Sequence, residues 1–169
     1  MRFNRLVAAL LPLVVLAGAC GGDDDKGDDT KVTTETTTGG EKTDGTAVTL
    51  KAPLSGAEEV PGPGANPGVG AALVDVSATK VCADLKVTMG EKPTLAHIHQ
   101  GAKGASGAVV VNLMPEFTPG ESAYSSPKKC VDTTAEISAA LIADPQSYYL
   151  NVHSDAHPNG AVRGQLAKF

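Results

Sequence analysis

The stretch Thr94–Leu113, TLAHIHQGAKGASGAVVVNL, decides the architecture that the rest of the chain must form. It opens with a short strand pattern over Thr94–His99, turns through Gly101–Gly107, and returns as a continuous apolar strand over Ala108–Leu113. Glycine stands at every third position of the turn, where a positive φ or a close backbone approach would require it. Such a strand, turn and strand predict a β-rich domain, and two of the four histidines of the chain lie on its first strand.

Other short strand patterns lie on both sides of this stretch. The clearest is Lys80–Thr88, where apolar and polar residues alternate and Cys82 falls on the polar side. The other predicted strands are Ala47–Ala52, Val69–Ala78, Tyr148–His153 and Ala161–Ala167. Turns rich in glycine and proline separate them, with Pro158-Asn159-Gly160 before the last strand.

One segment has the pattern of a helix. Thr133 followed by Glu136 predicts a capping box, the apolar residues after it repeat at helical spacing, and Asp144-Pro145 ends the helix. Many short strands, one short helix and frequent turns predict an all-β fold, an antiparallel Greek-key sandwich or barrel.

Composition limits both the core and the partners. The chain has 169 residues with 4% aromatic residues and no Trp, so the core must come mainly from Val, Leu, Ile and Ala. The net charge of -5 argues against nucleic acid as a partner. Much of the acidity lies in Asp23–Asp25 and Asp28–Asp29, and it therefore describes a tail rather than a binding face.

The N-terminus has the pattern of an export signal. Arg2 and Arg5 precede the apolar run Leu6–Leu16, and small residues lead to Cys20. We expect residues 1–20 to be a lipoprotein signal peptide in which Cys20 receives lipid, because the segment is too short to span a membrane and ends in a lipobox-like sequence. A plain secreted protein with an incidental cysteine is the alternative. The prediction places the protein outside the cell, lipid-anchored on the outer face of a bacterial membrane.

Two further predictions follow from composition and export. Residues 21–46 are rich in Asp, Gly and Thr and should form a disordered tether, leaving residues 47–169 as the folded domain. Outside the cytoplasm, Cys82 and Cys130 form an even pair that can oxidise to a disulfide. Two free thiols are the alternative.

The histidines are the strongest candidates for chemistry. Alternation along a strand places His97 and His99 on one face, and places His153 on a face with Tyr149 and Asn151. Together with His157 in the following loop, these histidines are candidate ligands for copper or zinc, and Asp155 is a further candidate ligand.

The sequence favours a structural role for these histidines, in which they hydrogen-bond to the backbone or to carboxylates such as Glu58 and Glu59. Arg163 could likewise form a buried ion pair with Glu58, Glu59 or Asp155. Motifs for a serine nucleophile, a phosphate loop or a dinucleotide are missing, so the sequence leans away from an enzyme.

Three segments together resemble the CHRD domain, the module repeated in the extracellular antagonist chordin and found singly in bacterial exported proteins. They are Leu54–Pro61 (LSGAEEVP), Ala96–Val111 (AHIHQGAKGASGAVVV) and Tyr148–Leu166 (YYLNVHSDAHPNGAVRGQL). The chain departs from the family pattern at Ala161-Val162-Arg163, where an acidic residue usually precedes the aliphatic residue. The resemblance implies an extracellular β-rich module with no established catalytic residues. The His97-x-His99 strand is also similar to the copper-side strand of Cu/Zn superoxide dismutase, so an immunoglobulin-like or superoxide-dismutase-like sandwich is expected.

These observations lead to one functional prediction and one alternative. The prediction is a membrane-anchored lipoprotein whose CHRD-like domain binds an unknown protein or glycan, or has a structural role. The alternative is a copper- or zinc-binding protein that uses the clustered histidines.

Overall fold

The computed structural model describes residues 46–121 and 123–169, which contain almost the whole predicted domain. The predicted signal peptide with Cys20, and nearly all of the predicted tether, lie outside these residues. The strands are β1 (Val48–Ser55), β2 (Val69–Val76), β3 (Lys80–Thr88), β4 (Pro93–Gln100), β5 (Val109–Asn112), β6 (Thr118–Pro119), β7 (Tyr124–Asp132), β8 (Tyr148–Ser154), β9 (Val162–Gln165) and β10 (Ala167–Lys168). One α-helix, α1 (Ala135–Ala143), and two short 3-10 helices, η1 (Gly56–Glu58) and η2 (Pro145–Ser147), complete the elements.

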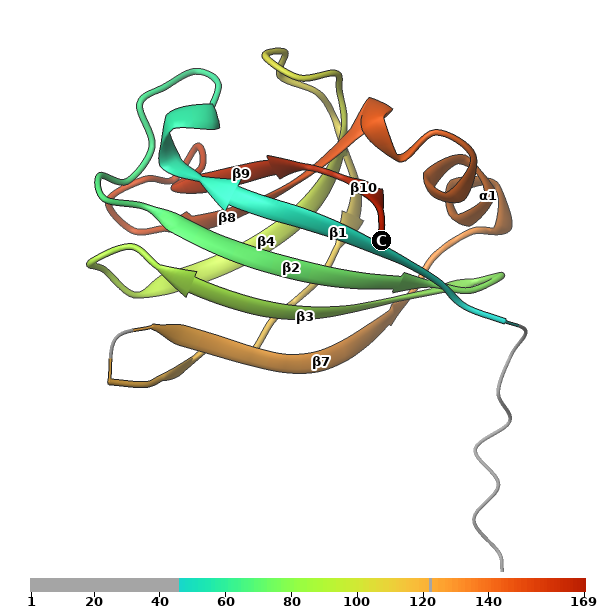
Figure 1. The fold of residues 1–169 in the computed structure, drawn as a ribbon, viewed down its shortest axis with the longest axis horizontal. Coiled ribbons are helices and arrows are strands. Elements are labelled where there is room, and N and C mark those ends of the chain that lie inside the picture. The colour runs from blue at the N-terminus through green and yellow to red at the C-terminus, as the bar shows by residue number, and fades with distance from the viewer. Residues whose placement is uncertain (1–45, 122) are drawn as a thin grey trace, which may run out of the picture. The chain divides into compact units, whose positions relative to one another are not determined.

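The strands form one curled antiparallel sheet in the order β5-β4-β8-β9-β1-β2-β3-β7-β6, with β10 beside β1 (Figure 1). The sheet bends where β9 meets β1, since the two strands pair only at Ser55 and Arg163. The β4-β8-β9 half therefore faces the β1-β2-β3 half across the core. The all-β prediction with one short helix is confirmed.

The core is aliphatic, as the composition predicts. On β3 the buried positions are Val81, Ala83, Leu85 and Val87, which confirms the predicted alternation. Facing residues from the other half of the sheet fill the same core, among them Ala96, Ile98, Leu150, Val152 and Val162. Burying each large aliphatic side chain stabilises the folded state by about 1.5–3 kcal/mol.

Strand β8 is buried along its whole length, on both of its faces. One face lies in the core, and loops cover the other face, which carries the polar residues. Arg163 Nη2 donates to the carbonyl of Ala102 at 3.1 Å, and Ser106 Oγ donates to the carbonyl of Val60 at 3.0 Å. These bonds hold the loop after β4 and the loop after η1 over the polar face, so a second, polar interior lies there.

The glycines of the predicted turn have the two roles expected of them. Gly104 has a φ of +79°, which favours glycine. A Cβ at Gly107 would lie 1.6 Å from the carbonyl oxygen of Gln100, and one at Gly101 would lie 3.0 Å from the ring of Tyr149. Close backbone approach therefore requires glycine at Gly107.

The helix begins one residue later than predicted. The N-cap of α1 is Thr134, whose hydroxyl accepts from the backbone N–H of Ile137 at 3.3 Å, so the prediction of Thr133 as the cap is wrong. Thr133 instead donates its backbone N–H to the carbonyl of Thr79 at 2.9 Å. Of the helices in residues 46–121 and 123–169, none is long and apolar enough to cross a membrane.

Sequence patterns did not predict strands β6 and β7. Most residues of β7 are exposed or half-buried, so its sequence lacks a clear apolar alternation. Pro127 also interrupts it, and the pairing with β3 shifts register beside this residue, between Ala83 and Leu85. A bulge is the usual way to keep a proline within a sheet.

Candidate metal centre

Strand pairing brings three of the four predicted histidines to one place. Strands β4 and β8 are antiparallel neighbours in which His97 lies opposite Asn151 and His99 lies opposite Tyr149. Because alternate side chains share a face, His153 lies on the same side as Asn151. Both histidine segments of the sequence therefore contribute to one polar face of the sheet.

The three rings of His97, His99 and His153 form a compact cluster. Nδ1 of His97 lies 3.0 Å from Nε2 of His153, and one ring nitrogen from each histidine lies within 4.8 Å of the others. In the part of the chain that the structure describes, this is the one group of three or more His, Cys, Asp or Glu side chains close enough to share a metal ion.

Backbone carbonyls fix the orientation of two rings. Nδ1 of His99 lies 2.9 Å from the carbonyl oxygen of Gly107, and Nδ1 of His153 lies 3.0 Å from that of Pro158. A carbonyl only accepts hydrogen bonds, so each Nδ1 carries the hydrogen and donates it. In the neutral rings, Nε2 then has a free lone pair directed at the cluster, as is usual for histidines that bind metals.

Burial favours the neutral form of His97 and His153. His99 is 9% exposed and His153 is 7% exposed, while His97 is half-buried. Burial, with smaller contributions from the neighbouring His153 and His99, lowers the pKa of His97 to about 4. Burial also lowers the pKa of His153, against the opposing effect of the Pro158 carbonyl. Neutral imidazole is the form that binds a metal.

The ring of Tyr149 stacks on the face of the His99 ring and restrains it. Tyr149 lies parallel to it, with ring centroids 4.7 Å apart and planes 7° apart. The guanidinium of Arg163, on the next strand, lies 3.4 Å from the centroid of the Tyr149 ring. The hydroxyl of Tyr149 accepts from the backbone N–H of Gly107 at 3.2 Å. The stack and these bonds leave the ring of His99 little freedom to turn.

The fourth predicted histidine lies elsewhere. Nδ1 of His157 lies 2.5 Å from Oε1 of Glu91, and this pair is outside the cluster of three. Asp155 is exposed and is likewise absent from the cluster. The structure thus brings together three of the four predicted histidines and separates His157 from them.

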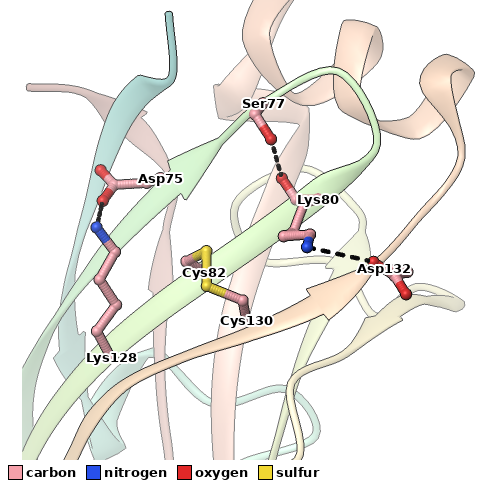
Figure 2. Close-up of a disulfide and its surroundings, with 7 residues drawn as sticks. All are labelled: Asp75, Ser77, Lys80, Cys82, Lys128, Cys130 and Asp132. Atoms are coloured by element: carbon pink, nitrogen blue, oxygen red, sulfur yellow. Dashed lines mark hydrogen bonds and ion pairs between the residues drawn. A yellow bond between two sulfur atoms is a disulfide. The ribbon is translucent and has the colours of Figure 1, made fainter. Parts of the chain in front are cut away.

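The predicted disulfide is confirmed. Cys82 and Cys130 lie opposite each other on β3 and β7, and their sulfurs are bonded at 2.03 Å (Figure 2). The bridge lies on the polar side of β3, as the alternation predicted. It joins two neighbouring strands rather than crossing the core.

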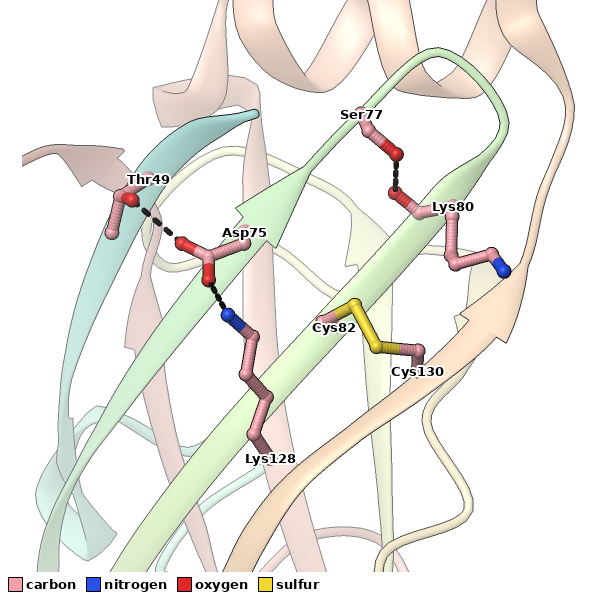
Figure 3. Close-up of polar contacts among 7 residues, drawn as sticks. All are labelled: Thr49, Asp75, Ser77, Lys80, Cys82, Lys128 and Cys130. Atoms are coloured by element: carbon pink, nitrogen blue, oxygen red, sulfur yellow. Dashed lines mark hydrogen bonds and ion pairs between the residues drawn. A yellow bond between two sulfur atoms is a disulfide. The ribbon is translucent and has the colours of Figure 1, made fainter. Parts of the chain in front are cut away.

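A polar network beside the disulfide ties three strands together. Asp75 accepts from the hydroxyl of Thr49 at 2.6 Å and forms an ion pair with Lys128 (Figure 3). The hydrogen bond from Lys128 and then that from Thr49 hold the pKa of Asp75 below its usual value. All of these groups have partners within the domain, which favours a structural role for this surface.

The sequence patterns did not reveal the environment of Glu59. This side chain is 5% exposed, and burial raises its pKa to about 7, although the charge of Arg163 opposes that rise. Its carboxylate occupies the space that a Cβ at Gly160 would need, 2.5 Å from Oε2. Of the other carboxylates proposed for Arg163, Glu58 pairs with Lys103 at 3.1 Å.

The residues that form this polar face belong to segments with a family signature. The sequence model of the CHRD domain matches residues 50–166. The chain belongs to the CHRD domain family. The match covers every residue of the histidine cluster and both cysteines of the disulfide, and it makes this CHRD domain a small binding or structural module of the extracellular type. No curated protein and no solved structure matches the chain.

Proposed function

We propose that this CHRD domain binds one copper or zinc ion between His97, His99 and His153, on a protein that is exported and lipid-anchored. The observation that carries the proposal is the convergence of three histidine ring nitrogens within 4.8 Å of one another. Imidazole nitrogen suits copper and zinc, and three histidines are a common ligand set for them.

The hydrogen bonds around the cluster favour metal binding over a purely structural role. The outward nitrogens of His99 and His153 already donate to carbonyls, so the inward nitrogens have no hydrogen to offer each other. Nδ1 of His97 can supply one hydrogen, to Nε2 of His153. Lone pairs thus outnumber the ring hydrogens at the centre, and a cation would satisfy them together.

Metal binding to the full chain, purified without a histidine tag, tests the proposal. Calorimetric titration with Cu(II) and Zn(II) should give one ion per chain. His97→Ala should abolish or strongly weaken binding, and this half-buried residue is the one of the three whose loss disturbs the core least. His157→Ala is the matched control and should bind like the wild type, because His157 lies outside the cluster. A wild type that binds neither metal, or a His97→Ala variant that binds equally well, would overturn the proposal.

Export and anchoring are supported by separate observations. Cys20 follows small residues at the end of an apolar run, and the disulfide is typical of a protein in an oxidising compartment. Metabolic labelling with a lipid precursor should mark the wild type and leave Cys20→Ala unlabelled. Equal labelling of both proteins would contradict the lipid anchor without affecting the metal site.

A further inference from the structure

A fourth polar group points into the histidine cluster. Asn151 lies on β8 between Tyr149 and His153 and is 2% exposed. Its Oδ1 lies 3.0 Å from Nε2 of His99 and 3.1 Å from Nε2 of His153. The amide oxygen therefore contacts Nε2 of both rings. These are the two nitrogens that point into the cluster, because Nδ1 of each ring bonds to a backbone carbonyl.

Counting hydrogens shows that these contacts are unusual. Nδ1 of His99 and Nδ1 of His153 each carry a hydrogen that goes to a backbone carbonyl, so in the neutral rings both Nε2 atoms hold lone pairs. The amide oxygen of Asn151 also holds lone pairs and has no hydrogen. Three acceptors at hydrogen-bond distance without a hydrogen between them repel one another, unless a cation lies among them.

Three of the separations in the cluster are close to those of ligand atoms around one ion. Bonds of about 2.0–2.1 Å from a tetrahedral metal place neighbouring ligand atoms about 3.3 Å apart. The separation between His97 Nδ1 and His153 Nε2 is 3.0 Å, and the two contacts of Asn151 Oδ1 are 3.0 and 3.1 Å. All three lie slightly below the expected value, and the ring nitrogens as a group lie within 4.8 Å of one another, so the rings would have to shift to admit the ion.

We propose that Asn151 is the fourth protein ligand of this centre and binds the metal through Oδ1. The inference rests on the proposed metal-binding function and completes its ligand set as three nitrogens and one oxygen. A set of four protein ligands is typical of structural metal sites, whereas catalytic zinc sites keep one position open for water. The bound ion would then stabilise the fold at the junction of β4 and β8.

The rival interpretation turns the amide by 180°, so that its NH₂ group donates to both Nε2 atoms. The metal would then have to displace Asn151 before it could bind. The two interpretations predict opposite effects of removing the side chain. Loss of a ligand weakens metal binding, whereas loss of a competing hydrogen-bond donor leaves it unchanged or tightens it.

The test measures Zn(II) affinity of the full chain by competition with a chelator. Asn151→Ala should weaken binding by at least about tenfold, since even residues that only support a metal ligand cost 10–100-fold when replaced. Asn151→Asp, which keeps an oxygen at this position, should bind at least as tightly as the wild type. His157→Ala is the control with unchanged affinity. Thermal unfolding without metal shows that each variant is folded, and saturation with zinc should raise the midpoint for the wild type more than for Asn151→Ala.

The outcomes separate this inference from the function on which it rests. An Asn151→Ala variant that binds zinc as tightly as the wild type, while His97→Ala does not, would overturn the role of Asn151 and leave the three-histidine centre intact. Failure of the wild type to bind zinc or copper would overturn both. A crystal structure of the zinc-loaded wild type shows directly whether Asn151 binds the metal, even if Asn151→Ala does not fold. We expect Oδ1 about 2.0–2.2 Å from the ion, and an amide turned away from it would refute the inference.

Discussion

Replacement of Glu59 by glutamine should stabilise the CHRD domain at pH 8 and leave its stability nearly unchanged at pH 4. Glu59 is 5% exposed, and its Oε1 has no hydrogen-bond partner among residues 46–121 and 123–169. Burial raises the pKa of this carboxyl from 4.5 to about 7, although Arg163, the Val60 backbone and His157 all act in the opposite direction. The cost of burying the charge thus exceeds the attraction to its neighbours.

The sign and size of the effect follow from this pKa. A carboxyl whose pKa is higher in the folded state binds its proton more tightly there. Its contribution to the free energy of unfolding is fully present below pH 4.5 and is lost as the pH rises through 7. The rise from 4.5 to about 7 corresponds to about 3 kcal/mol, at 1.36 kcal/mol per pKa unit. Glutamine resembles the protonated acid and does not titrate, so the variant avoids this loss.

Urea denaturation of both proteins at several pH values between 4 and 8 provides the measurement. The difference in the free energy of unfolding between variant and wild type should grow from near zero to about 3 kcal/mol across this range. Other titrating groups, including the histidine cluster, are common to both proteins and largely cancel in the difference. A difference that does not vary with pH would refute the raised pKa of Glu59. A less stable variant at pH 8 would show that the attraction to Arg163 outweighs the cost of burial.

Three further predictions concern stability. Replacing Cys82 and Cys130 together by serine should cost about 4 kcal/mol in urea denaturation, because the bridge closes a loop with a sequence separation of 48; an unchanged midpoint would contradict a bridge in solution. Gly160→Ala should lower the thermal midpoint, because the φ of Gly160 is +139° and a Cβ would lie 2.5 Å from the Glu59 carboxylate. A midpoint equal to that of the wild type would show that the turn can move. Leu150→Ala should cost 2–5 kcal/mol in urea denaturation because this core side chain is fully buried, and a loss below 1 kcal/mol would mean that the core collapses around the gap.

The strands that carry the core were predictable because burial on one face leaves a period of two in the sequence. Strand β3 has the predicted bounds, Lys80–Thr88, and the predicted inward residues. Strand β7 was not predictable, since its residues are mostly exposed and Pro127 interrupts it. The cap of α1 differs by one residue because Thr133 and Thr134 are equally suitable by type, and only the path of the chain into the helix selects Thr134.

The candidate site, like the fold, was predictable from the sequence only in part. Alternation along each strand assigned His97 and His99 to one face and grouped His153 with Asn151, from local sequence alone. Whether the two groups meet depends on β4 pairing with β8 in one register, across a separation of 56 residues between His97 and His153. No local pattern encodes such a pairing, because it depends on how the whole core packs.

The sequence by itself determined which side chains could bind a ligand or metal and which face of each strand they occupy. It also predicted that Cys82 and Cys130 can pair. Tertiary structure alone decided that three histidines form one cluster while His157 pairs with Glu91. It also placed the carbonyls of Gly107 and Pro158 behind the rings, and so directed their lone pairs inward. The physical reason is that the orientation of a ring depends on contacts with loops distant in sequence, whereas the face on which it lies depends only on the strand that carries it.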